Sequence, residues 1–176
     1  ENNNLFHFTN IGYQSYFVND QIIASMEKMK FDCYRLGHFK HNLAETEVIL
    51  RDADLISFDV SSLKQSEAPG RCLASPNGFY SEDVCQIARY AGISDKLSTL
   101  GLYELNPLYD NNTQSAQLLA QMIWYVFDGY VHRHFEKPEV SNENYIRYMV
   151  DSDEDEKSMV FWKSKKSGRW WMEVPF

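Results

Sequence analysis

Two acidic side chains stand at the ends of segments with strand character, where α/β proteins bind ligands. Segment 53–60 predicts a buried parallel strand, because residues 55–60 are mostly apolar, and Asp59 lies near its end. Segment 97–105 predicts a second strand, which ends at Glu104. Ligands of open α/β sheets bind outside the carboxyl ends of the strands. Asp59 and Glu104 are therefore candidate functional carboxylates. The alternatives are an Asp59 that caps the following loop and a Glu104 that caps a helix or lies on the surface.

Carboxylates at such positions can do two kinds of chemistry. Their oxygens are hard ligands for metal ions. A carboxylate also has two acceptor oxygens, which can bind a cation. Asp59 and Glu104 thus suit a metal site, a cation-binding site or both.

Other candidate sites are weaker. His38 and His41 are three residues apart and could ligate a metal if their segment were helical, although ordinary surface histidines are the default. The acidic run 151–156 predicts a solvated turn and lacks the spacing of an EF-hand calcium loop. Trp170 and Trp171 favour a packed sheet edge over a ligand platform.

Composition limits the class of protein. A chain of 176 residues, of which 44% are hydrophobic, is large enough for a globular domain with its own core. The formal charge of −8 argues against a nucleic-acid surface, and no apolar run has the length of a membrane span. The three cysteines form no C-x-x-C pair, which favours the cytoplasm. The chain begins with Glu1, without a signal peptide or a starting Met, and we expect a piece of a longer protein.

Periodicity and capping residues predict an alternation of strands and helices. The predicted strands are 5–14, 31–36, 53–60 and 97–105; the predicted helices are 21–30, 43–53, 81–90 (closed by Gly92) and 113–131; and 61–78 is a long loop. This order is typical of a three-layer α/β/α fold with a mainly parallel sheet. After Pro138, segments 145–150, 159–164 and 169–174 predict antiparallel strands. We expect an α/β portion at 1–137 and an appended β element at 138–176.

Two motifs carry a resemblance to a known family. Residues 57–60 (S-F-D-V) match the start of a segment S-x-D-V-D-x-x-D-P, and residues 104–107 (E-L-N-P) match a segment E-x-N-P. Both segments belong to the arginase/agmatinase/formimidoylglutamase family, the ureohydrolases. The chain resembles this family from about residue 8 to about residue 133, and it is most similar to bacterial formimidoylglutamase-like members.

The resemblance implies an arginase-like fold and a metal-dependent amidinohydrolase. In the family, the two aspartates of the first motif bridge two manganese ions, and the glutamate of the second holds the amidine or guanidinium of the substrate. The resemblance thus implies Asp59 as a metal ligand, Glu104 as the substrate-binding and catalytic carboxylate, and Asn106 as a residue that binds substrate or shapes the turn with Pro107. The implied partner is a small-molecule amidine or guanidine, and a homo-oligomer stays open. Metals serve such hydrolysis by lowering the pKa of bound water.

The chain departs from the family pattern in three places. Ser61 stands where the second bridging aspartate belongs. The later D-P pair is not matched, although residues 68–70 (A-P-G) resemble the family's proline-rich turn that follows. Nothing matches the family's G-G-D-H and D-A-H-x-D ligand segments. The first hypothesis is the C-terminal portion of an amidinohydrolase, inactive alone. The second is a non-catalytic relative that has lost its metal site and serves binding or assembly. The third is an unrelated α/β domain, for which Asp59 and Glu104 would lie at different edges.

Overall fold

The structure, a computed structural model, describes residues 5–139, 143–151 and 158–174. Contacts divide the chain into two compact units, Glu1–Arg133 and His134–Phe176. Each unit has a hydrophobic core of its own. The first unit is α/β and the second is all-β, which are the classes predicted for these parts of the chain.

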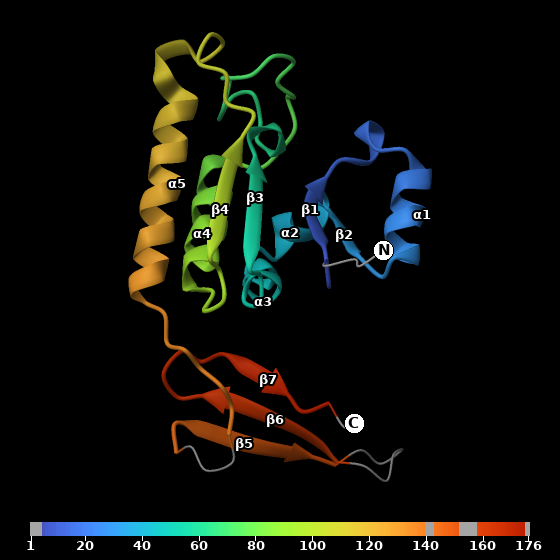
Figure 1. Cartoon of the computed structure of the whole chain (residues 1–176), viewed down its shortest axis with the longest axis vertical. Helices are drawn as coiled ribbons and strands as arrows, with labels where there is room; N and C mark the ends of the chain where they lie inside the picture. The colour runs from blue at the N-terminus through green and yellow to red at the C-terminus, as the bar shows by residue number, and fades with distance from the viewer. Residues whose placement is uncertain (1–4, 140–142, 152–157, 175–176) are drawn as a thin grey trace. The chain divides into compact units, whose positions relative to one another are not determined.

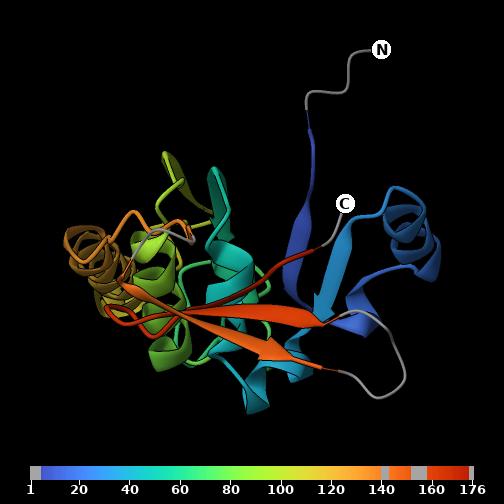
Figure 2. The same cartoon turned by 90° about the horizontal axis from the view of Figure 1, so that it is seen from below.

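The first unit begins with a parallel pair of strands. Strand β1 (Thr9–Tyr13) pairs with β2 (Asp32–Arg35), and the connection runs through η1 (Ser15–Phe17) and α1 (Asp20–Lys28). Helix α1 lies beside β2 on the side away from β1 (Figures 1 and 2). It begins at Asp20, one residue before the predicted start, because the Asn19 side chain accepts a hydrogen bond of 2.9 Å from the N–H of Gln21 and so caps the helix.

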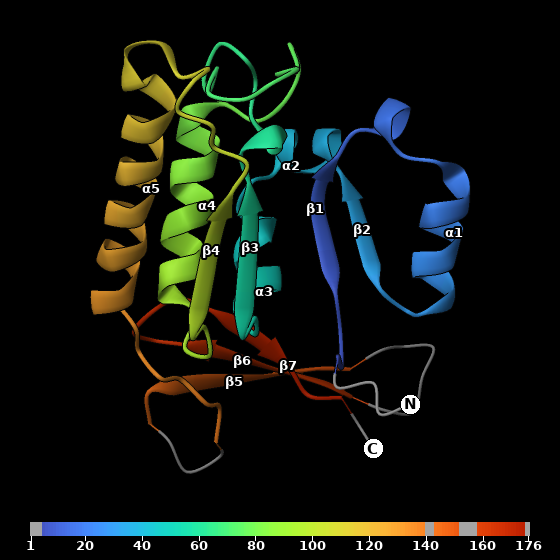
Figure 3. The same ribbon diagram turned by 45° about the horizontal axis from the view of Figure 1, so that its top comes forward.

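A second parallel pair carries both candidate carboxylates. Its elements, in chain order, are α2 (Leu36–His41), α3 (Glu45–Leu50), β3 (Leu55–Asp59), η2 (Val60–Ser62), α4 (Ser81–Ile93), β4 (Thr99–Tyr103), η3 (Asn111–Thr113) and α5 (Gln114–Val131). Strands β3 and β4 are parallel neighbours. All four strands of the unit point the same way, so their carboxyl ends lie at one end of it (Figures 1 and 3).

The predicted class is confirmed, but the parallel strands form two pairs where one sheet was expected. No described strand hydrogen-bonds to the edge of β3 that faces away from β4, or to the edge of β1 that faces away from β2. A shared core joins the two pairs instead, with buried side chains from α2, η2, α4 and α5 and from the loop at 63–79. Leu36 and Phe39 of α2 belong to this core, and their burial explains a short helix where the sequence predicted a strand end and a loop.

Helices α4 and α5 pack closely through two glycines. The sequence predicted that Gly92 ends its helix, and this was wrong, because α4 continues to Ile93. A Cβ atom on Gly92 would lie 2.2 Å from the carbonyl oxygen of Val126, and one on Gly129 would lie 2.3 Å from that of Arg89. Both glycines therefore serve the close approach of the two helices.

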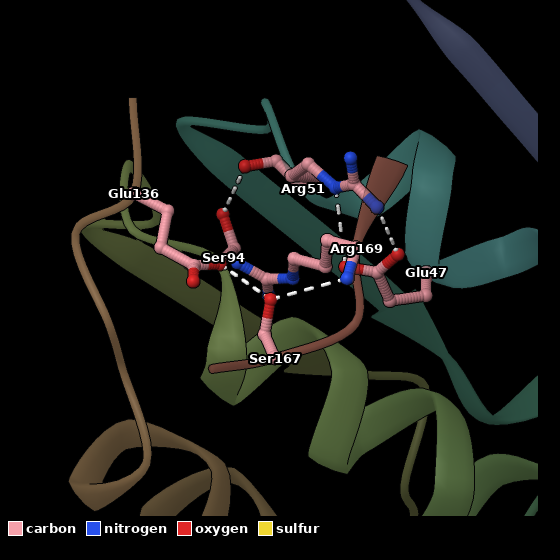
Figure 4. A network of polar contacts seen from close by, with 6 residues as sticks. All are labelled: Glu47, Arg51, Ser94, Glu136, Ser167 and Arg169. Atoms are coloured by element: carbon pink, nitrogen blue, oxygen red, sulfur yellow. Dashed lines mark hydrogen bonds and ion pairs between the residues drawn. The ribbon is translucent and has the colours of Figure 1, made fainter. Parts of the chain in front are cut away.

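A buried serine, Ser94, holds the chain just before the N-terminal end of β3. The Ser94 hydroxyl, fully buried after α4, donates to the carbonyl oxygen of Arg51 at 3.0 Å. The Arg51 guanidinium donates in turn to both carboxylate oxygens of Glu47, at 3.2 and 2.6 Å (Figure 4). These bonds hold the end of α3 to the end of α4, on either side of the start of β3.

The second unit is a three-stranded antiparallel sheet of β5 (Tyr145–Val150), β6 (Met159–Ser164) and β7 (Trp170–Met172). Strands β5 and β6 coincide with the prediction, and Figure 2 shows the sheet in orange and red. Ser167 stabilises the turn after β6. Its hydroxyl donates to the Glu136 carboxylate at 2.5 Å and accepts from the N–H of Arg169 (Figure 4). Residues 152–156 of the acidic run lie outside the described residues.

Candidate active site at the carboxyl ends of β3 and β4

The structure brings the two candidate carboxylates to the same edge. In the parallel register of β3 and β4, Asp59 lies opposite Tyr103, and Glu104 follows directly. Both residues thus end neighbouring strands at the carboxyl side, which is where α/β proteins bind ligands. The third hypothesis, an unrelated α/β domain, expected Asp59 and Glu104 to lie at different edges. This arrangement therefore disfavours it.

Asp59 combines the capping role with an exposed position. Its Oδ1 accepts a hydrogen bond of 2.7 Å from the N–H of Ser61, and its carbonyl oxygen accepts one of 2.8 Å from the Ser62 hydroxyl. These bonds start η2 and fix the carboxylate at the end of β3. Because Asp59 is exposed and its other carboxylate oxygen has no partner among the described residues, a ligand can still reach it.

Glu104 stands at a sharp change of backbone direction. Its φ of 67° lies in the left-handed region, which a non-glycine residue adopts rarely and which is enriched at functional sites. The side chain is exposed, and within the described residues its carboxylate has neither a hydrogen bond nor an ion pair. The alternative that Glu104 caps a helix is therefore not observed, and the carboxylate is free to bind a cation.

The turn after Glu104 is fastened to the long loop. The N–H of Asn106 donates to the carbonyl oxygen of Gly70 at 2.8 Å, and the N–H of Gly70 donates to the Ser115 hydroxyl at 2.8 Å. The Asn106 side chain accepts from the N–H of Leu108 at 3.0 Å. Asn106 thus shapes the turn, and the A-P-G segment that resembled the family's proline-rich turn lies against the E-L-N-P segment.

Sequence reasoning missed the residues that support this turn. Asp110 accepts hydrogen bonds from the N–H groups of Ser115 and Ala116, at 2.8 and 2.9 Å. Burial opposes the charged form, but these bonds prevail and lower the pKa of Asp110. An aspartate shortly before a predicted helix is a usual capping signal, so the residue could have been found. Ser115, fully buried, gave no such signal.

The described residues do not by themselves complete a metal centre. Within 5–139, 143–151 and 158–174, no group of three His, Cys, Asp or Glu side chains lies close enough to hold a metal ion. At the end of β3 the donor set is the Asp59 carboxylate with the Ser61 hydroxyl two residues on, and a hydroxyl is a weaker ligand than a carboxylate. The manganese pair that the resemblance implies thus does not fit this set of residues alone.

Among the residues that the structure describes, the histidine pair belongs to no metal-binding group either. The segment is helical, as α2, but Nε2 of His38 lies 3.0 Å from a carboxylate oxygen of Glu45. The His38 ring packs against Phe39 and Tyr34, with centroids 4.8 and 5.2 Å apart. This environment agrees with ordinary partly exposed histidines.

With this geometry established, comparison with known proteins identifies the class of the chain. The profile of the Arginase family matches residues 3–128, which is most of the chain. The chain therefore belongs to the arginase family. Among the described residues, no helix has both the length and the apolar character needed to cross a membrane.

Within the family, the chain is similar to curated formimidoylglutamases. The Staphylococcus aureus (strain MRSA252) enzyme is 29% identical over 79 residues, which are 44% of this chain and 25% of that protein. The Enterobacter sp. (strain 638) enzyme is 29% identical over 92 residues, 51% of this chain and 30% of that protein. The matched segments thus span less than a third of these curated relatives.

Solved structures show the same fold. Trypanosoma cruzi formiminoglutamase, oxidized and with Mn2+2 at pH 8.5, matches with a TM-score of 0.68 at 20% identity, over 72% of this chain and 46% of that one. Bacillus caldovelox arginase matches with a TM-score of 0.58 at 15% identity, over 69% and 42%. The arginase fold is thereby established, and the chain spans less than half of each of these proteins.

Proposed function

We propose that this chain is part of a manganese-dependent amidinohydrolase that cleaves a C–N bond of a small linear amidine or guanidine, such as formimidoyl-glutamate or arginine. The observation that carries the proposal is the placement of Asp59 and Glu104 at the ends of adjacent parallel strands of an arginase-family fold. The manganese in the T. cruzi formiminoglutamase structure and the names of the curated relatives support it. The proposed compartment is the cytoplasm.

Each carboxylate has a separate role in this proposal. Glu104 binds the planar cation of the substrate, because its two oxygens are exposed and have no partner among the described residues. Asp59 is one metal ligand, held in place by the bond from the N–H of Ser61. Asn106 keeps Glu104 at the site through its bond to Gly70 rather than by direct contact with substrate.

The remaining ligands are proposed to come from outside this chain. The described residues offer too few donors for a metal centre, and the chain spans less than half of the T. cruzi enzyme. We therefore expect this chain alone to be inactive. The longest form of the protein is the one to test.

The test separates the two carboxylates by two measurements on that longest form. After manganese loading, metal content is measured by mass spectrometry, and hydrolysis of formimidoyl-glutamate, arginine and agmatine is assayed. Asp59→Ala is expected to lose bound metal and activity together. Glu104→Gln keeps its shape but loses its charge, and is expected to retain metal and to lose activity about 100-fold or more.

Glu82→Gln is the matched control, because Glu82 is exposed in the first turn of α4 and has no partner among the described residues. It should change neither measurement. Absence of bound metal from the longest form would sink the hydrolase proposal. It would favour a non-catalytic relative in which Ser61 marks a lost site.

A further inference from the structure

A cavity opens at the carboxyl ends of the other strand pair, β1 and β2. Its volume is about 670 Å³, which is within the range of small-molecule sites. The lining comes from the residues at the ends of β1 and β2, from η1, from α2 and from Asn77 of the long loop. Figure 3 shows these strand ends at the upper side of the unit, beside α2. Neither Asp59 nor Glu104 lines the cavity.

The charge of the lining is opposite to that of the chain. The whole sequence has 25 acidic and 17 basic residues, yet the lining contains Arg35, His38 and Lys40 and no carboxylate. Four acidic groups stand outside the lining but close to it. Glu45 is paired with His38, Asp20 lies within electrostatic reach of Arg35, and Asp32 and Glu27 lie within reach of Cys33. A cavity with this lining attracts an anion.

Two of the cations are not neutralised by the protein. The Nε of Arg35 donates to the Tyr13 hydroxyl at 3.2 Å, and within the described residues the guanidinium forms no ion pair. Lys40 likewise has no described carboxylate partner, and its Nζ lies 5.5 Å from the centre of the Tyr80 ring. The two terminal nitrogens of Arg35 are thus available as a fork, the geometry that binds carboxylate or phosphate with two parallel hydrogen bonds.

Part of the cavity lining is held together by hydrogen bonds. Gln14, which is buried, donates from Nε2 to the carbonyl oxygen of Asn77 at 3.2 Å. The Tyr16 hydroxyl donates to Oε1 of Gln14 and accepts from Nδ2 of Asn77. The Tyr13 hydroxyl accepts from Arg35, so its own proton remains available for a ligand. The cavity thus offers the Tyr13 hydroxyl as a donor beside the cations, next to side chains that are already ordered.

We propose that this cavity is a binding site for a small organic anion, a carboxylate- or phosphate-bearing molecule, with the Arg35 fork and Lys40 holding the anionic group. Tyr13 donates the third hydrogen bond, and Tyr16 with Tyr34 covers the apolar part of the ligand. The site stands apart from the two carboxylates of the candidate active site, and it does not depend on hydrolase activity.

The experiment is titration calorimetry of the full chain with two probes, inorganic phosphate and glutarate, at constant ionic strength and up to about 10 mM. Arg35→Gln is expected to weaken binding by about tenfold or more, since hydrogen bonds between charged groups are lost. Arg35→Lys keeps the charge without the fork and should fall between. Lys40→Gln is a second variant that leaves the bond between Arg35 and Tyr13 intact.

Lys28→Gln is the control, because it removes one exposed positive charge at the end of α1, outside the cavity. It should leave binding unchanged, and an unchanged thermal midpoint should show that each variant is folded. Tighter binding of phosphate than of glutarate, or the reverse, identifies which anionic group the site takes. Binding of neither probe, or equal weakening by Lys28→Gln and Arg35→Gln, overturns the proposal.

Discussion

At the scale of single residues, three carboxylates of the first unit accept hydrogen bonds from backbone N–H groups or from a serine hydroxyl. Asp59 accepts from the N–H of Ser61, and Asp110 accepts from the N–H groups at the start of α5. Glu67, in the long loop, accepts from the Ser81 hydroxyl at 2.5 Å and from its N–H at 3.2 Å. The loop near the candidate site is therefore ordered by polar contacts, which is why its stability should depend on pH.

The bond between Ser81 and Glu67 gives a testable pH effect. The Ser81 hydroxyl is the largest cause of a lowered pKa of Glu67, with the N–H of Ser81, Ser66 and Lys64 adding to it against burial. A carboxylate whose pKa is lower in the folded state stabilises that state above its unfolded pKa, and the contribution is lost as pH falls through the folded pKa. Ser81→Ala should lower the free energy of unfolding by about 1 kcal/mol near pH 7 and by less near pH 3.

Urea unfolding at both pH values measures this difference. Glu67→Gln completes a double-mutant cycle. In that background, Ser81→Ala should lower the free energy of unfolding by less near pH 7, because the charged acceptor is already gone. An equal cost of Ser81→Ala at both pH values would show that the serine acts through the start of α4 and not through the carboxylate.

At the scale of elements, the pairing of α4 and α5 depends on the absence of two side chains. Gly92→Ala should lower the free energy of unfolding by about 2 kcal/mol, because its Cβ would lie 2.2 Å from a backbone oxygen of α5 and would push the helices apart. The measurement is chemical denaturation of the full chain. The expected loss exceeds the benefit that alanine normally brings to a helix.

Gly37→Ala is the matched control for that substitution. Gly37 also lies in a helix, α2, but nothing lies within 4 Å of the position that its Cβ would take. The variant should be as stable as the wild type or up to about 1 kcal/mol more stable. A similar loss in both variants would contradict the role of close helix packing.

Elements with a strong pattern could be predicted from the sequence, and those formed by distant contacts could not. The alternating strands β5 and β6 and the long apolar period of α5 were found nearly to the residue. Helix α2 was missed because it is short, and its support is the burial of Leu36 and Phe39 in the shared core. Gly92 was misjudged because a glycine pattern does not distinguish a helix end from a helix crossing.

The same limit applies to the candidate site. Asp59 and Glu104 were visible because each ends a predicted strand and lies in a motif. The bond between the N–H of Asn106 and the carbonyl oxygen of Gly70 was not, since backbone contacts between distant turns leave no periodic signal. The facing of Arg35 and Tyr13 arises from the register of β1 and β2, which single-sequence patterns do not specify.

At the scale of the whole molecule, the first unit should fold without the second. Its core contains no residue beyond α5, and the profile match ends within α5. Arg133 closes the unit, because its guanidinium donates to the carbonyl oxygens of Gly92 at 2.8 Å and Leu97 at 3.1 Å. The second unit has its own small core of Tyr145, Val160 and Trp162.

A chain shortened to residues 1–137 therefore tests the predicted division directly. It keeps Arg133 and places the new terminal carboxylate beyond the end of α5. We expect its near-ultraviolet circular dichroism to retain the signal of an ordered core, and its unfolding transition to stay cooperative.

In the full chain, Arg133→Ala should lower the free energy of unfolding by about 2 kcal/mol. Two hydrogen bonds from a charged donor are lost, and two part-buried carbonyl groups are left without that donor. If the shortened chain loses its cooperative transition while Arg133→Ala keeps it, the second unit contributes to the fold of the first, and the division at this point is wrong.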